Sequence, residues 1–161
     1  MSGASVDRGR ILVDLDAEER RLLGGLLQTA TDALIDTADP ARARLLPDGY
    51  RGDADAAAEF ARYTRDDTRR DKLSRIGGMR ATLDAATAAR IPLDHEDADA
   101  WARVLTDVRV VVAERAGIRT DDDVPADPVL AQLYGWLGHL QWSLVEALDR
   151  VERKGRRGRR L

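Results

Sequence analysis

The chain has 161 residues, 43% hydrophobic and 34% charged, a composition that excludes wholesale disorder and suits one domain of ordinary size. It has no cysteine, which excludes a disulfide, a catalytic thiolate, a thiol redox switch and a Cys-ligated metal. The net charge of −3 is unevenly distributed, because six cations fall in the last nine residues: Arg153, Lys154, Arg156, Arg157, Arg159 and Arg160.

The chain is expected to begin with a short extended segment and a helix. Residues 11–15 alternate weakly between apolar and polar side chains, which is typical of an extended segment beside a core or of an edge strand. Asp16 is a suitable N-cap, and Glu19 stands at the capping-box spacing. The first long helix should therefore run from here to about Ile35.

The middle of the chain predicts a short helix and then a longer helical unit. Asp39-Pro40 is typical of the start of a short helix, and Asp53 or Asp55 should cap the next one. Near Arg65–Asp67 this helix either continues or breaks into a new helix, and the pattern leaves both alternatives open. Ile91-Pro92-Leu93 is expected to end the unit.

The last two predicted helices carry the strongest apolar patterns. One begins after Asp94 and ends at Gly117, and an acidic loop over residues 121–123 follows it. The final helix should run from about Asp127 to Val151 and then fray into the basic tail. One face of it carries a continuous apolar seam, which makes it the central helix of the core: Leu130, Leu133, Leu137, Leu140, Leu144 and Val151.

The expected fold class is all-α, a single-domain bundle of about five helices, with the option of a short N-terminal extended segment. Residues 1–152 should form the helical domain, and residues 153–161 a basic, disordered tail. No stretch approaches a transmembrane span, and residues 1–10 lack the apolar core of a signal peptide. We therefore expect a cytoplasmic protein without membrane contact, which the absence of cysteine also fits.

The sequence offers no catalytic constellation. His95 and Asp99 have the spacing of two metal ligands on one helix face, but acidic residues in a first helical turn more simply complement the helix dipole. His139 lies beside the apolar seam without an evident nucleophile or carboxylate, so we expect a packed, hydrogen-bonded histidine. These patterns predict a protein that is not an enzyme and has no metal, no cofactor and no catalytic residue.

The candidate partner-binding residues are Arg65, Asp67, Arg69, Arg109 and Trp142. Asp107 and Arg109 lie in a helix rich in Val and Leu, and Arg65, Asp67 and Arg69 lie in the middle helical unit. They can form an interhelical ion-pair network or be surface charges with apolar stems, and the sequence does not decide between these alternatives. Trp142 lies off the leucine seam and is a candidate interface anchor.

The C-terminal end offers two further contacts. The six tail cations, unbroken by an acid, can contact phosphates of a nucleic acid or an acidic partner. The alternative, somewhat favoured because the tail lacks an aromatic residue for stacking, is a solubilising tail or one that folds back on the acidic body. Gly135 and Gly138 permit close approach of another helix, from this chain or a second copy.

A resemblance to a known family rests on order and spacing over nearly the whole chain, the tail excepted. The residues that carry it are Val13-Asp14-Leu15 with Glu18; Leu45-Leu46-Pro47-Asp48-Gly49-Tyr50; Glu59-Phe60, Thr64-Arg65-Asp66-Asp67 and Lys72-Leu73; Trp101, Leu105 and Asp107-Val108-Arg109; Arg115 and Gly117; and Tyr134, Trp136-Leu137, Leu140-Gln141 and Leu144. In this combination the chain resembles the actinobacterial DUF2017 family.

The resemblance implies a small, cytoplasmic, helical regulator rather than an enzyme. Members are labelled as an oxidative-stress transcriptional regulator (AosR), and their genes are often found beside the Clp protease adaptor ClpS. The expected partner is therefore a protein of the transcription or the proteolysis machinery, with DNA and a homodimer as further options. Because this chain has no cysteine, a thiol of its own cannot sense an oxidant.

Overall fold

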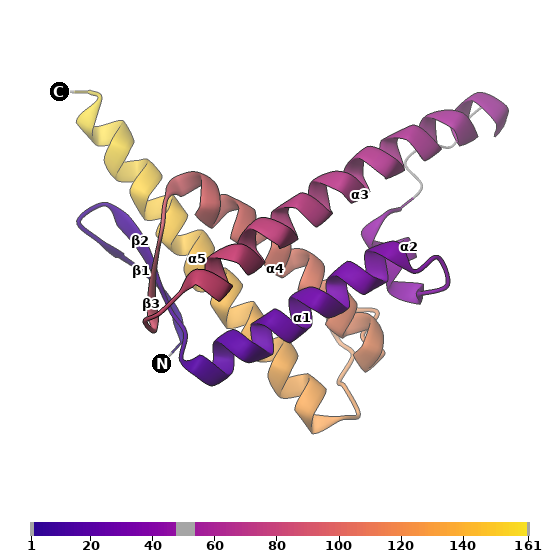
Figure 1. The fold of residues 1–161 in the computed structure, drawn as a ribbon, viewed down its shortest axis with the longest axis horizontal. Coiled ribbons are helices and arrows are strands. Elements are labelled where there is room, and N and C mark those ends of the chain that lie inside the picture. Colours follow the sequence, from indigo (N-terminus) through magenta and orange to yellow (C-terminus); the bar gives the residue numbers. More distant parts are fainter. Residues whose placement is uncertain (1, 48–53, 161) are drawn as a thin grey trace.

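The computed structural model describes residues 2–47 and 54–160, and its account of side chains further omits those of residues 54–58, 60 and 61. Five helices surround one apolar core, and a small sheet lies against one side of it (Figure 1). The helices are α1 (Ala17–Ile35), α2 (Pro40–Leu45), α3 (Ala54–Ala85), α4 (His95–Ala116) and α5 (Pro128–Gly158). The strands are β1 (Gly3–Asp7), β2 (Arg10–Asp14) and β3 (Arg90–Leu93).

The sheet corrects the expectation of an all-α fold. β1 and β2 form an antiparallel hairpin, and β3 pairs antiparallel with the other side of β2. The hairpin turn places Arg8 at φ 49° and Gly9 at φ 80°, the two positive angles of a type I′ turn. A short extended segment at the N-terminus was an option in the sequence, but a third strand from residues 90–93 was not.

Pro92 sits at the free edge of the sheet, which explains how a proline fits inside a strand. Leu15 N donates to Ala89 O at 2.9 Å, and the register pairs Leu12 with Pro92. Because hydrogen-bonded pairs alternate along an antiparallel ladder, the nitrogen of Pro92 faces away from β2. The missing N–H therefore costs no ladder hydrogen bond.

The leucine seam of α5 lies in the core, as predicted, except for Leu130, which is half-buried and outside the core cluster. Leu137, Leu140 and Leu144 are buried, and Leu133 and Val151 are partly buried against the same cluster. They pack against α4, where Trp101 is 2% exposed, and against the hairpin, where Ala4 N donates to Ser143 Oγ at 2.9 Å. α5 is therefore the central helix of the fold, with α4 on one side and β1 on another.

The predicted starts of α1, α4 and α5 are confirmed, whereas for α3 the proposed cap Asp53 lies outside the described residues and the alternative, Asp55, lies inside the helix. The capping box of Asp16 and Glu19 is confirmed, and Asp94 caps α4 by accepting from Asp97 N at 2.7 Å. α3 runs unbroken through Arg65–Asp67, which settles the open alternative in favour of continuity. The predicted fraying after Val151 is wrong, because α5 continues to Gly158.

Two helices, α3 and α5, each have one end that projects beyond the core. In Figure 1 the N-terminal part of α3 and the C-terminal part of α5 extend away from the other elements in different directions. Between Glu59 and Arg75, no side chain that the structure describes is buried, and Ile76 is the first one that is. We call the part of α3 up to Asp71 the α3 arm. No described helix has the length and apolar character needed to cross a membrane.

Candidate functional site

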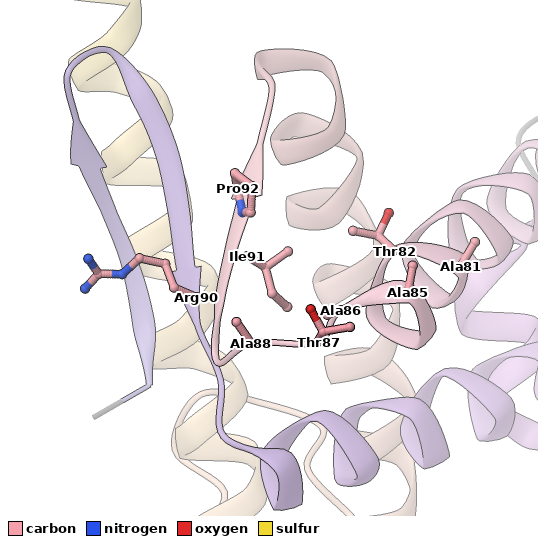
Figure 2. Close-up of a pocket in the computed structure, with 9 residues that line it drawn as sticks. All are labelled: Ala81, Thr82, Ala85, Ala86, Thr87, Ala88, Arg90, Ile91 and Pro92. Carbon is pink, nitrogen blue, oxygen red and sulfur yellow. The ribbon is translucent and has the colours of Figure 1, made fainter.

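The hollow between the end of α3 and β3 is lined by small side chains. It has a volume of about 520 Å³ and is formed by Ala81, Thr82, Ala85, Ala86, Thr87, Ala88, Arg90, Ile91 and Pro92 (Figure 2). The one charged side chain, Arg90, points away from the alanine and threonine side chains and pairs with Asp14 at 3.0 Å. This lining offers hydroxyl groups but no acid, base or nucleophile with a partner.

A second hollow, of about 650 Å³, lies between α1 and α3, and several of its polar side chains join the two helices. Arg20 donates to Ala88 O at 2.6 Å, and Arg80 donates to Gln28 Oε1 at 2.6 Å. These bonds tie α1 to α3 and to the segment before β3. Arg20, Gln28 and Arg80 therefore hold the helices together, while Arg21 and Asp84, which also line the hollow, make no side-chain hydrogen bond or ion pair with the described residues.

The five candidate partner-binding residues lie in three separate places. Arg65, Asp67 and Arg69 lie on the α3 arm, Arg109 lies between α4 and α5, and Trp142 lies on the outer face of α5. On the arm, Asp67 pairs with Arg70 at 3.0 Å and Arg69 with Asp66 at 3.5 Å. Arg65, Asp67 and Arg69 share the arm and are partly exposed, but the five predicted residues do not form one site.

The base of the α3 arm is fixed by a buried ion pair. Lys72 Nζ lies 2.6 Å from Asp107 Oδ1, and Asp107 is 4% exposed. The second oxygen of Asp107, Oδ2, has no hydrogen-bond partner among the described residues. For Asp107 the interhelical ion pair, and not a surface charge, is therefore the correct alternative.

Arg109 packs between α4 and α5 and does not take part in that pair. Its Nη1 donates to Gln141 Oε1 at 2.9 Å, and its guanidinium lies 4.7 Å from the centre of the Tyr134 ring. It also covers Gly138, where an added Cβ would lie 3.5 Å from Nη2. Arg109 therefore joins the two central helices.

Arg115 and Asp39 join α4 to α2. Arg115 Nη1 and Nη2 donate to the two oxygens of Asp39 at 2.9 and 2.5 Å, and Asp39 also caps α2 by accepting from Ala41 N. The Arg115 guanidinium holds the pKa of Asp39 below its ordinary value, and the backbone hydrogen bond from Ala41 lowers it further. The bidentate geometry makes this pair more than a screened surface contact.

Replacing Asp39 by Asn tests this pair, because Asn keeps the cap and loses the charge. A pKa that is lowered in the folded state adds stability above the unfolded pKa, and this stability is lost as the pH falls through the folded pKa. At pH 7 we expect Asp39→Asn to lower the free energy of unfolding by about 1 kcal/mol, since Arg115 is partly screened by solvent. Urea unfolding measures the difference in the free energy of unfolding between the variant and wild type. This difference should shrink as the pH is lowered below 3.8, the ordinary pKa of an aspartate. A difference that is equal at pH 7 and at acid pH would contradict it.

The basic end of α5 projects as a helix. The last described residues, 152–160, are all exposed, and Arg153 pairs with Asp149 at 2.9 Å. Within the part of the chain that is described, the other five cations of the tail have no ion pair: Lys154, Arg156, Arg157, Arg159 and Arg160. Because most of this segment is helical, the spacing of these cations along α5 is fixed.

The outer face of α5 exposes large apolar side chains. Trp142 is 62% and Val145 is 50% exposed, while on the opposite face Leu140 is 1% exposed. His139 is exposed beside Trp142, with ring centres 6.5 Å apart, so the expectation of a packed histidine is wrong. The sequence pointed to Trp142, and Val145, three residues on, is a member of this face that it missed.

The metal-like spacing of His95 and Asp99 leads to two separate ion pairs. His95 Nε2 lies 3.0 Å from Glu152 Oε1, and Asp99 pairs with Arg103 at 3.0 Å. Among the side chains that the structure describes, no group of three His, Asp or Glu residues lies close enough together to hold a metal ion. The contact with Glu152 instead ties the start of α4 to the projecting part of α5.

Comparison with known proteins identifies a family. The family model described as "Domain of unknown function (DUF2017)" matches residues 1–148, and its match ends before the basic end of α5. No curated protein and no solved structure matches the chain. The match covers the sheet, the α3 arm, α4 and α5 up to Leu148. The chain therefore belongs to the DUF2017 family.

Proposed function

We propose that this protein is a non-enzymatic regulator that acts by binding another protein through the α3 arm. The observation that carries the proposal is the absence of any buried side chain among those described between Glu59 and Arg75. A helix in water is only marginally stable without packing against a neighbour. An arm of this length is therefore best explained by a partner that covers it.

The charge of the arm favours a protein over a nucleic acid. Between Glu59 and Lys72 the chain carries five cations and four anions, so the arm is close to neutral. Polyanion binding needs an excess of positive charge, because affinity comes from the phosphates that are neutralised. A mixed surface with an exposed aromatic residue, Tyr63 at 68%, suits a protein interface.

The arm is also held in a defined direction. Lys72 and Asp107 lock its base onto α4 through a buried ion pair at 2.6 Å. Preorganisation of this kind lowers the cost of ordering a surface when it binds. Asp67 and Arg69 lie just beyond this anchor and would be the first polar contacts of the partner, whereas Arg65 lines a hollow with Asp39 and Arg42 of its own chain.

The partner that we propose is a component of the transcription apparatus, in line with the oxidative-stress regulator label of the family that the chain resembles. An adaptor role in Clp proteolysis is the alternative, and it would use the same arm. In either case a signal of oxidation must reach the protein indirectly, since a chain without cysteine has no thiol to oxidise.

Site-specific photo-crosslinking tests the proposal. A photoreactive amino acid at Tyr63, on the arm, should capture a transcription protein in the native host, and the same group at Arg21, exposed on α1, should not. Capture of a Clp component at Tyr63 would assign the alternative. Equal capture at the two positions, or none at Tyr63, would contradict a binding role for the arm.

A further inference from the structure

The outer face of α5 carries a second regular seam, opposite the buried leucines. Its spacing of three and four residues places the members on one side of the helix. None of these side chains is buried. The members of this outer seam are Ala131, Gly135, Gly138, Trp142, Val145, Asp149, Arg153, Arg156 and Arg160.

Small and large residues are sorted along the outer seam. Gly135 and Gly138 come near its start, and Trp142 and Val145, both exposed, follow them. An added Cβ at Gly135 would meet nothing within 4 Å, so the space above this glycine is open in the single chain. A large side chain from outside can approach the backbone there.

We propose that two copies of this chain pair through α5, with the two helices antiparallel. In a two-fold arrangement each contact occurs twice, so a surface must be complementary to itself. When the helices cross between Gly138 and Trp142, each Val145 lies on the partner's open Gly135, and each Trp142 comes level with the partner's Gly138, where it meets the partner's Arg109. A large side chain of each seam thereby fills the open space above the partner's Gly135.

In the same register, oppositely charged residues of the two chains come close to each other. Arg153 comes level with the partner's Asp127, the exposed N-cap of α5. Arg156 and Arg157 reach toward the loop that holds Asp121, Asp122 and Asp123, all exposed. The excess of positive charge at one end of α5 thus meets the excess of negative charge at the other end. A parallel pair would instead bring like charges together.

This inference is independent of the proposed function, because it uses α5 and not the α3 arm. The other occupants of the basic end would be a nucleic acid or an unrelated acidic protein. Neither would explain why the open Gly135 precedes the exposed Trp142 and Val145 on the same face. A second copy of the chain explains the size pattern and the charge pattern together.

Gly135→Leu is the sharpest test, because the site is open in the single chain and filled in the pair. Sedimentation equilibrium should show a concentration-dependent dimer in the full chain. We expect Gly135→Leu and Trp142→Glu each to raise its Kd by about 30-fold or more, as loss of an interface anchor does. Gly25→Leu is the matched control, since Gly25 is exposed in α1 and also meets nothing within 4 Å.

Charge exchange tests the register. Asp123 organises its loop by accepting from the backbone of Arg119 and Thr120, so the substitutions are placed at Asp121 and Asp122. Asp121→Lys with Asp122→Lys should weaken self-association, and so should Arg156→Glu with Arg157→Glu. Mixing the two double variants should restore a dimer formed from one chain of each.

Spin labels test the orientation, and a chain without cysteine suits them. Labels on Gln132→Cys should lie about 24 Å apart along the helix axis, and those on Arg150→Cys about 30 Å, from the rise of 1.5 Å per residue. A mixture of the two labelled variants should give a short distance between them. Short distances within each labelled variant would indicate a parallel pair and overturn the proposal.

Three other results would overturn it. One is a monomer at all concentrations, and another is a dimer that neither Gly135→Leu nor Trp142→Glu weakens. The third is a combination of two findings. The basic end of α5 binds duplex DNA in a salt-dependent way, and the double variant Arg156→Glu with Arg157→Glu self-associates as well as wild type.

Discussion

Replacing Lys72 by methionine is expected to lower the free energy of unfolding by about 3–5 kcal/mol. Asp107 is 4% exposed, and Lys72 is its one cationic partner among the described residues. Without that lysine the carboxylate remains buried and unpaired, which is the costly situation. Chemical unfolding of the variant and of wild type at pH 7 measures the difference.

Two further variants separate charge from packing. Lys72→Met combined with Asp107→Leu removes both charges and should recover most of the loss, because a buried pair is often replaceable by apolar residues. Arg70→Met breaks the exposed pair with Asp67 and should change stability by less than about 0.5 kcal/mol. A double variant as unstable as Lys72→Met alone would contradict the explanation.

Leu140→Ala is expected to lower the free energy of unfolding by about 2–5 kcal/mol. Leu140 is 1% exposed at the centre of the α5 seam, so its loss leaves a cavity between α5 and its neighbours. Gln132→Ala, exposed on the same helix, is the matched control and should stay within about 0.5 kcal/mol of wild type. Equal effects at both positions would mean that the seam is not the core.

The helices were predictable because their signals are local. Asp16 with Glu19 and Asp94 before α4 each satisfy backbone groups within a few residues, so short stretches of sequence carry the information. The periodic apolar seam of α5 likewise needs no knowledge of its neighbours. These signals located the helix starts and the central helix.

The sheet was not predictable by the same means. β3 pairs with a strand far away in the sequence, and Pro92 argues against a strand unless the edge position is known. The Arg8-Gly9 turn lacks the Asn-Gly or Asp-Gly pair that marks most type I′ hairpins. The end of α5 was missed for another reason, since Glu, Arg and Lys favour helix even without packing.

The candidate sites were only partly predictable because their partners are distant in sequence. Asp107 and Arg109 were recognised as unusual in an apolar helix, but Lys72 and Gln141 come from other helices. Trp142 was recognised by its position off the leucine seam. The outer seam as a whole became visible only once the buried face of α5 was known.

Amide hydrogen exchange along α3 is the measurement that most directly tests the claim that the arm exists to be covered by a partner. In the isolated protein, exchange should be fast over residues 59–71 and slow around Ile76 and Met79, which are buried. Adding the captured partner should slow exchange over the arm and leave the residues around Met79 unchanged. Slow, uniform exchange along the whole of α3 in the isolated protein would contradict the account, because the arm would then need no partner.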